Sequence, residues 1–194
     1  MKKIKLSFLA GLFSFFTIGV LSALTYKTDY GVFLIASFGS TMVILYGYPD
    51  SPFAQPKNIF FGHLLTSFVG VIFVSFIQLP LFIILPLAVG FGVGLMILFN
   101  VPHPPAGGNP IIVILGSVSF DYLLNPIMVG SIIIIVFGII LNRFILKKKI
   151  SNPKINLYEI IKLFSISKPI NIPIINANIN FFLFIFLALE ILHF

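Results

Sequence analysis

Long uncharged stretches separated by short polar connections dominate the pattern of this chain. Residues 6–24 carry no charged side chain, and nineteen residues of helix are enough to cross the hydrocarbon core of a bilayer. Further stretches of bilayer length are residues 30–48, 59–79, 81–99 and 126–146, with Pro80 in a tight connection and Pro126 at a helix start. The pattern predicts an all-α, polytopic membrane helix bundle.

One apolar stretch is shorter than the others and follows a cluster of helix breakers. The sequence NVPHPPAGGNP, residues 100–110, holds four prolines, two glycines and a histidine, and residues 111–120 are apolar again. This combination predicts a half helix, or a span whose first turns are broken. The bundle therefore has about six transmembrane segments.

The two ends of the chain leave alternatives open. The basic start and the apolar run of residues 6–24 also resemble a signal peptide, but the run is long and more spans follow it, so we interpret it as the first span. Near the other end, residues 179–194 are apolar apart from Asn180, Glu190 and His193. This C-terminal segment, within residues 170–194, either crosses as a marginal seventh span or lies in the interface.

Composition and charge support a single transmembrane domain over residues 1–194. Of these residues 59% are hydrophobic and only 9% are charged, which leaves no room for a substantial soluble domain. The net charge of +7 comes from lysines before the first span and in a basic linker, residues 147–168. These positions indicate anchoring at a lipid bilayer rather than binding to nucleic acid, and they place both ends of the six-span core in the cytoplasm of an inner or plasma membrane.

The sequence offers no constellation that supports catalysis. It has no cysteine, its five acidic residues are scattered, and no phosphate-binding glycine loop appears. We therefore expect no enzyme activity, no cofactor and no metal site.

Two parts of the chain resemble each other. Residues 39–47, GSTMVILYG, and residues 107–116, GGNPIIVILG, both run from small residues into Val-Ile-Leu and Gly, and a Pro then opens an apolar helix. The spacing is about 68 to 70 residues. Two units of three spans, residues 6–79 and 81–146, would form an inverted repeat, although small residues and short apolar strings also align by chance.

The proline cluster is a candidate anion site. With His103 as N-cap and Pro104 as the first helical residue, the backbone N–H groups of Ala106, Gly107 and Gly108 have no helical acceptors. Such N–H groups at a helix N-terminus bind anions.

The same cluster also allows a second arrangement. Pro110 cannot donate to the carbonyl of Ala106, which would leave that oxygen for water or a cation. Alternatively, Asn109 caps a helix that begins at Pro110.

Two histidines and two polar segments complete the candidate pathway. His103 and His63 are titratable near neutral pH, although helix capping or an interfacial hydrogen bond also explains them. Gln55, Lys57 and Asn58 lie in a proline-rich connector and would form a basic mouth, or simply a loop. Three small residues match the glycines of the proline cluster in the repeat, and they would face the same centre or serve helix packing: Gly39, Ser40 and Thr41.

Three segments, HPPAGG (103–108), SPFAQPKNIFFGH (51–63) and AVGFGVGLM (88–96), resemble the HPP family of integral membrane proteins. The resemblance runs from about residue 22 to residue 146. It implies that two groups of residues carry the family motifs: His103, Pro104, Pro105, Ala106 and Gly107 in the signature, and Ser51, Pro52, Ala54, Gln55, Pro56, Asn58, Gly62 and His63 in the second motif. Lys57 stands where the family often has arginine, which keeps the charge but not the planar fork.

The resemblance implies a function, because plastid and cyanobacterial members of the family are nitrite transporters. We therefore expect a transporter or channel for a small inorganic anion, nitrite first and nitrate or formate next. If protons are coupled, His103 is the first candidate. The alternatives are a non-transporting scaffold or subunit, and a transporter of a small cation or neutral solute. A homo-oligomer stays open, since no segment specifies an interface.

Overall fold

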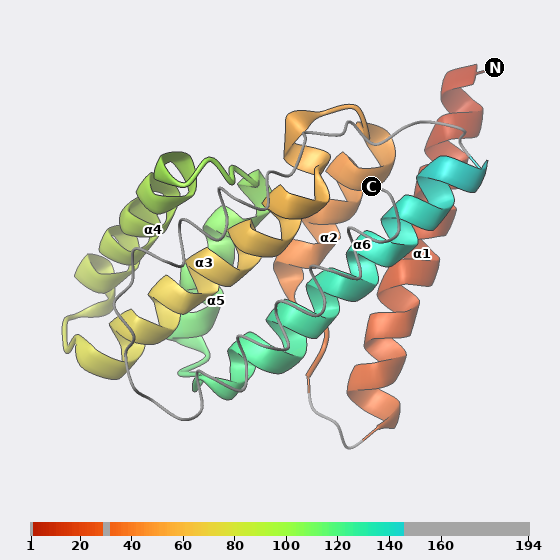
Figure 1. The fold of residues 1–194 in the computed structure, drawn as a ribbon. Coiled ribbons are helices and arrows are strands. Elements are labelled where there is room, and N and C mark those ends of the chain that lie inside the picture. The colour runs from red at the N-terminus through yellow and green to blue at the C-terminus, as the bar shows by residue number, and fades with distance from the viewer. Residues whose placement is uncertain (1, 29–31, 146–194) are drawn as a thin grey trace, which may run out of the picture. The chain divides into compact units, whose positions relative to one another are not determined.

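A computed structural model describes residues 2–28 and 32–145 of the chain (Figure 1). They all belong to one compact unit, Met1–Ser151. The expectations for the linker 147–168 and for the segment 170–194 lie outside the described residues. Within the described ranges all regular structure is helical, in six α-helices with short 3₁₀ or π extensions, as the hydropathy pattern predicts.

Four of the described helices are long and apolar enough to cross a membrane: Lys3–Lys27, Pro56–Phe76, Leu81–Leu98 and Leu123–Phe144. The first three correspond to α1 (Lys2–Lys27), α3 (Pro56–Phe76) and α4 (Leu81–Leu98). The last combines the π-turn η4 (Leu123–Val129), α6 (Gly130–Ile140) and the π-turn η5 (Leu141–Ile145). These are four of the five long spans that the sequence predicts.

The fifth, predicted over residues 30–48, is wrong as a full-length span. The helix there covers only Ala36–Gly47, as α2 (Ala36–Met42) and the π-turn η1 (Val43–Gly47). The four residues before it are not helical, and the backbone N–H of Phe33 donates to the side-chain oxygen of Thr25 at 2.9 Å. Twelve residues of helix span about 18 Å, well short of the hydrocarbon core.

The second short helix lies where the proline cluster predicts it. A 3₁₀ turn, η3 (Pro104–Gly108), leads directly into α5 (Asn109–Leu115). Asn100 ends the preceding helix α4 with a left-handed φ of 54°, and the N–H of Val101 donates to the carbonyl of Met96 at 2.9 Å. This is the Schellman arrangement, in which an asparagine replaces the usual glycine. The breakers thus end one helix and begin another.

The last span departs from its predicted start. Pro126 lies inside η4 rather than at a helix start, because the helix begins at Leu123. A π-turn accommodates the missing N–H of proline, which an α-helix interior does not.

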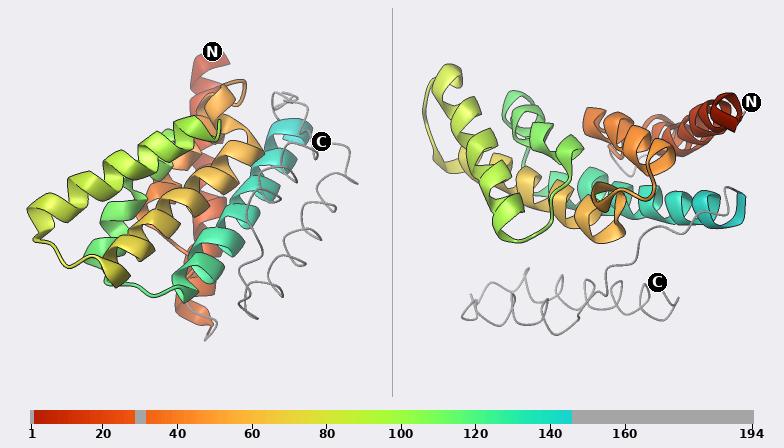
Figure 2. Two further views of the ribbon diagram at one scale, coloured as in Figure 1. Left: turned by 60° about the vertical axis from the view of Figure 1, so that its left-hand side comes forward. Right: turned by 90° about the horizontal axis from the view of Figure 1, so that it is seen from above.

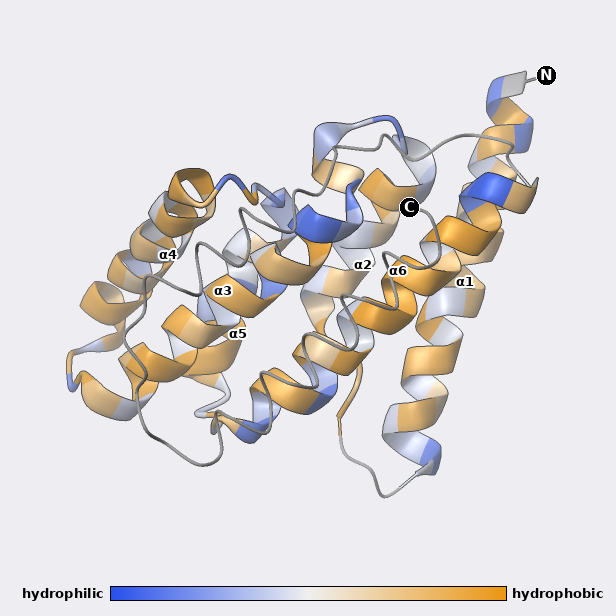
Figure 3. Ribbon diagram, viewed as in Figure 1, coloured by the Kyte–Doolittle hydropathy of each residue, from blue (hydrophilic) through white to orange (hydrophobic). Residues whose placement is uncertain are grey.

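The six helices form two layers. Seen from above, α4, α5, α2 and α1 lie in one row, and α3 and α6 cross on one side of that row (Figure 2). Helices α3 and α6 run in opposite directions, and the end of α6 lies at the same end of the bundle as the start of α1 (Figure 1). Hydrophobic residues cover the helices along their length, and hydrophilic residues gather toward the helix ends (Figure 3). This distribution fits a bundle that is embedded in lipid.

Glycines permit each short helix to approach a long one. A Cβ on Gly70 of α3 would lie 2.8 Å from Cβ of Val113 on α5, and a Cβ on Gly138 of α6 would lie 2.6 Å from Cδ2 of Leu45 on η1. Gly138 lies 68 residues after Gly70, and Val113 lies 68 residues after Leu45. The two close contacts thus recur with the same spacing along the chain.

A second pair of contacts repeats in the same register. A Cβ on Gly62 would lie 3.3 Å from the carbonyl oxygen of Val101, and a Cβ on Gly130 would lie 3.0 Å from the carbonyl oxygen of Phe33. Gly130 lies 68 residues after Gly62, and Val101 lies 68 residues after Phe33, as in the first pair of contacts. The spacing agrees with the 68 to 70 residues expected from the sequence.

We predict that Gly70→Ala lowers the stability of the bundle. The new methyl group would also lie 3.0 Å from Cα of Pro110, and backbone cannot move aside as a flexible side-chain end can, so overpacking costs about 1–3 kcal/mol. Thermal unfolding of the purified protein in detergent measures the effect. Gly94→Ala is the matched control, because nothing lies within 4 Å of the position that its Cβ would take. Equal midpoints for the two variants would contradict the close packing of α3 on α5.

Candidate functional site

Four polar side chains from four separate segments meet inside the bundle. They are Thr41 of α2, His63 of α3, His103 before η3 and Asn109 of α5. Thr41, His63 and His103 have no exposed surface and Asn109 is 1% exposed. We call these four residues the histidine cluster. It lies where the two short helices, α2 and α5, contact the long helix α3.

Thr41 joins the two imidazoles. Its Oγ1 lies 3.0 Å from Nε2 of His63 and 3.0 Å from Nε2 of His103. The rings meet edge to face with centroids 4.9 Å apart. Buried hydrogen bonds of this kind are strong and specific, since water cannot replace them.

The partners of the other ring nitrogens determine which nitrogens carry protons. Nδ1 of His103 lies 2.8 Å from the carbonyl oxygen of Phe53, which only accepts, so Nδ1 carries the proton and Nε2 of the neutral ring accepts. Nδ1 of His63 lies 3.1 Å from the amide nitrogen of Asn109, which only donates, so the proton of neutral His63 is on Nε2.

These assignments give the cluster one direction of donation. Asn109 donates to His63, His63 donates to Thr41, Thr41 donates to His103 and His103 donates to the carbonyl of Phe53. The order follows from partners that only donate or only accept.

Of the two polar atoms in the Asn109 side chain, the nitrogen has hydrogen-bond partners and the oxygen has none. Its Nδ2 also lies 2.9 Å from Oγ of Ser67 and 3.2 Å from the carbonyl oxygen of His63. Its Oδ1 is buried and has no hydrogen-bond partner in the structure. A buried acceptor without a donor is costly, so this atom is suited to a water molecule or a bound ligand that donates.

Small and aromatic residues position the cluster. A Cβ on Gly62 would lie 2.7 Å from Cβ of His103, so a larger residue there would displace the histidine. The ring of Phe38 meets the other imidazole, that of His63, edge to face at 5.0 Å. Backbone approach at Gly62 and ring packing at Phe38 therefore fix both rings.

The turn η2 (Pro52–Ala54) covers the cluster from the loop that precedes α3. Besides the bond from His103 to Phe53, the side chain of Asn58 donates to the carbonyl of Pro52 at 2.8 Å. Ser51 accepts from the N–H of Phe53 at 3.2 Å. The second family motif thus holds the turn against both the start of α3 and His103.

His103 lies outside the four candidate spans, and its burial determines its charge. Burial disfavours the charged imidazole and lowers the pKa of His103 from 6.5 to about 4, whereas the hydrogen bond to the carbonyl of Phe53 raises the pKa. His103 is therefore neutral at pH 7, in agreement with its hydrogen-bond partners.

The expected backbone anion site lacks the free groups of Ala106. His103 is the N-cap residue and Pro104 the first helical residue, as predicted, but the N–H of Ala106 already donates to the carbonyl of His103 at 2.9 Å. The carbonyl of Ala106 accepts from the N–H of Asn109, so it is not free either. A 3₁₀ turn closes one residue earlier than an α-turn, and this uses the groups that an α-helix would leave unpaired.

The alternative cap is also wrong. Helix α5 begins at Asn109 and its N-cap residue is Gly108. The side chain of Asn109 points to His63 and Ser67 instead of capping the helix.

The other predicted residues lie around the cluster and are not among its hydrogen-bonding members. Ser40 donates to the carbonyl of Ser37 in its own helix, and Gly39 is exposed. Gln55 and Lys57 are half-buried at the start of α3. Within the proline cluster, Pro104 is exposed, Ala106 is buried against Gly62, and the rest are half-buried, namely Pro105, Gly107 and Gly108.

Three participants were not predicted: the Ser67 hydroxyl, the backbone carbonyl of Phe53, and the backbone carbonyl of Ser37, which lies 3.0 Å from Oγ1 of Thr41. Ser67 lies one helical turn after His63, on the same face, and this spacing is the signal that would have found it. No pattern in the sequence indicates that these two backbone carbonyls take part.

Comparisons with known proteins agree with the resemblance. The family model described as "HPP, transmembrane region" matches residues 1–151. A transmembrane protein of Dictyostelium discoideum is 33% identical over 126 residues, which are 59% of this chain and 43% of that protein. A second one is 31% identical over 150 residues, which are 70% of this chain and 47% of that protein.

The chain spans about half the length of these curated relatives. No solved structure matches it. The family match covers most of the chain, including the whole histidine cluster. The chain therefore belongs to the HPP transmembrane region family, whose members are integral multi-pass membrane proteins.

Proposed function

We propose that this chain carries a small inorganic anion across the membrane, with nitrite as the first candidate and nitrate and formate next. The observation that supports it best is the bridge from Thr41 to both imidazoles, buried where two short helices meet. Interrupted helices that meet within a bundle are a common setting for transporter sites. The family resemblance adds the substrate class.

The histidine cluster is a better candidate for the anion site than the backbone of η3. Four groups there carry polar hydrogens, namely the Thr41 hydroxyl, the two imidazoles and the Asn109 amide. Side chains can turn their hydrogens toward an incoming ligand, whereas the N–H of Ala106 is held by the carbonyl of His103. Polar groups this deeply buried are retained mainly where function needs them.

We further propose that the six segments form an inverted repeat of three and three. Supporting it are the glycine contacts that recur in one register and the opposite directions of α3 and α6 (Figure 1). In such a repeat each half can rock against the other, and a central site then faces the two sides in turn. The cluster is closed in this structure, and displacement of η2 from His103 would open it.

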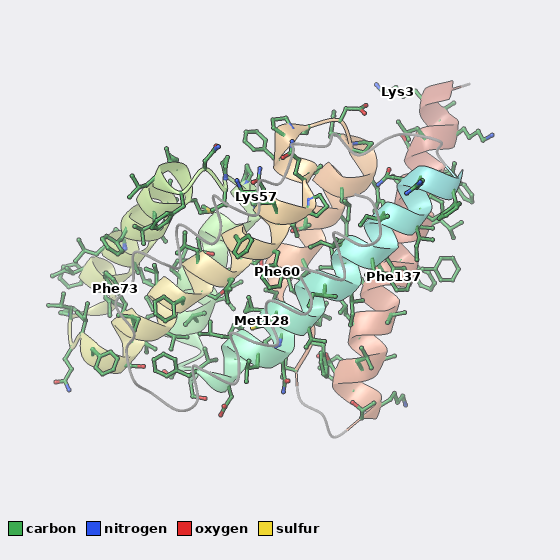
Figure 4. All side chains as sticks on the ribbon, in the orientation of Figure 1. Lys3, Lys57, Phe60, Phe73, Met128 and Phe137 are labelled. Carbon is green, nitrogen blue, oxygen red and sulfur yellow. The ribbon has the colours of Figure 1, made fainter. Side chains whose placement is uncertain are left out.

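The basic residues indicate how the bundle is oriented in the membrane. Lys3 and Lys57 lie toward the same end of the bundle (Figure 4), which is also the end that η2 covers. By the positive-inside rule this end faces the cytoplasm. Lys57 would then attract anions from that side.

A small neutral solute is the second candidate, and one atom favours it. The unpaired Oδ1 of Asn109 accepts a hydrogen bond and would repel an anion's oxygen. A solute with an O–H or N–H group would satisfy it. The uptake experiment separates the two candidates.

We predict saturable nitrite uptake into proteoliposomes that contain the purified protein, and a loss of about 10- to 100-fold in Asn109→Leu at subsaturating nitrite. Leucine has a similar size but no donor, and a hydrogen bond to a charged ligand contributes about 1.5–3 kcal/mol. Isotopic or colorimetric nitrite assays measure the rate.

The matched control is Thr66→Val, which removes another buried hydroxyl of the bundle, one that donates to the Gly62 carbonyl of its own helix at 2.8 Å. This variant should keep wild-type uptake. Full activity in Asn109→Leu would place the anion elsewhere. Well-folded protein that carries neither nitrite, nitrate nor formate would refute anion transport, and uptake of a neutral solute would then favour the second candidate.

A second prediction concerns orientation and uses the absence of natural cysteines. Single cysteines at exposed positions near the helix ends should fall into two groups when intact cells are treated with a membrane-impermeant maleimide. Gln78→Cys and Ser119→Cys should react from outside, because they follow α3 and the short segment of η3 and α5, which both lead away from the cytoplasmic end. Lys5→Cys and Asp50→Cys should react only after the cells are opened.

Reactivity of all four cysteines from one side would contradict six crossings. The reverse pattern would keep the six crossings but overturn the cytoplasmic placement of the two ends.

A further inference from the structure

We infer that the histidine cluster takes up one proton together with each anion, and that the Thr41 hydroxyl is the switch that makes this possible. The inference rests on the proposed function and adds to it the coupling ion, the stoichiometry and the residue responsible. It starts from the hydrogens available around one oxygen atom.

Thr41 Oγ1 has three polar neighbours at the same distance. They are Nε2 of His63, Nε2 of His103 and the carbonyl oxygen of Ser37, each 3.0 Å away. A hydroxyl has one hydrogen to donate and two lone pairs to accept with. In the neutral cluster it accepts from His63 and donates to His103, as the partners of Nδ1 on both rings require.

One added proton fits when the hydrogen bond between Thr41 and His103 reverses its direction. When it binds to Nε2 of His103, that nitrogen becomes a donor to Thr41 Oγ1, and the hydroxyl turns its hydrogen to the carbonyl of Ser37. One N–H bond forms, and the proton comes from water on the side from which the anion enters. Both states leave Thr41 and both Nε2 atoms paired, and only the hydroxyl hydrogen rotates.

A second proton does not fit. Both rings would then be cations with centroids 4.9 Å apart, in a site without exposed surface. The second proton would also have to bind Nδ1 of His63, which accepts from the amide nitrogen of Asn109 at 3.1 Å, and two donors would then face each other there. The hydrogen-bond partners of the two rings thus favour one proton.

The surrounding elements supply no fixed charge to balance that proton. Helices α2, α4, α5 and α6, with η3 and η4, contain no ionisable side chain. The other titratable groups on the elements around the cluster are Lys57 at the start of α3, Tyr46, whose hydroxyl bonds to Thr17 at 2.6 Å, and the exposed Tyr48 and Asp50 of the loop before η2.

A buried charge without a partner is costly. Near neutral pH a protonated cluster is therefore stable only with a bound anion, and a bound anion only with the proton. The two cross together, and the cycle carries no net charge.

The test is nitrite uptake into proteoliposomes with a pH-sensitive dye inside, under an imposed pH gradient or an imposed potassium-valinomycin potential. We expect one proton to enter with each nitrite, an acceleration of up to about tenfold when the external pH is one unit lower than the internal pH, and no response to the potential. Nitrite uptake that follows the potential and ignores the pH gradient would overturn the inference while leaving the proposed function intact.

Variants of Thr41 separate the hydroxyl from the shape of the side chain. Thr41→Ser keeps the hydroxyl and should keep coupled uptake. Thr41→Val keeps the shape, and its uptake should lose acceleration by the pH gradient. Thr66→Val is the control for removal of a buried hydroxyl that donates within its own helix, and it should behave as the wild type. Coupled uptake in Thr41→Val at the wild-type ratio would overturn the role of the hydroxyl.

A readout without transport keeps the inference independent of the substrate. The chain has three histidines, so nitrogen-15 NMR of histidine-labelled protein can follow the two cluster rings, with His63→Gln and His103→Gln for assignment. On acidification to near pH 4 we expect the pair of rings to bind one proton. In Thr41→Val we expect the pair to bind less than one proton at the same pH. Two protons on the pair would refute the inference even if nitrite is transported, whereas one proton in a protein that carries no nitrite would support the switch and refute only the substrate.

Discussion

Backbone polar groups inside a membrane protein must find partners within the protein, and this constraint shapes the whole bundle. Two of its helices, α2 with η1 and η3 with α5, are too short to cross a bilayer. The 3₁₀ turn after His103 closes the free groups before α5 among buried residues. Left-handed Asn100 and Ser117 close the neighbouring helix ends at exposed positions. The irregular backbone after His103 is tolerated because protein groups pair with it.

Close packing by glycine brings these short helices to the long ones. Because Gly70 has no side chain, α5 packs closely on α3, and Gly138 allows η1 to pack closely on α6 in the same way. Each half of the chain thus supplies a short helix to the third helix of the other half. The polar side chains on the short helices, Thr41 and Asn109, both contact His63, and they are separated by the same spacing as the paired glycines.

The histidine cluster combines full burial with groups that change charge or donor direction. Two neutral imidazoles share one hydroxyl, and that hydroxyl has a second acceptor at the same distance. A cluster of this kind has two satisfied hydrogen-bond patterns that differ by one proton. Packing alone does not require such an arrangement, and apolar side chains would fill the same space at lower cost.

The sequence by itself determined the membrane class, the helical fold, most of the spans and the short segment after the proline cluster, because hydropathy and helix breakers act locally. It also singled out His103, His63, Thr41 and Asn109 as separate candidates, and it indicated the register of the repeat. It failed on the span at residues 30–48 and on the free backbone groups of Ala106. Local pattern does not distinguish an extended apolar segment from a helical one, or a 3₁₀ turn from an α-turn.

Only the tertiary structure decided which polar residues meet and which atoms carry the hydrogens, because residues 41, 63, 103 and 109 are brought together by helix packing and by backbone carbonyls that the sequence does not reveal.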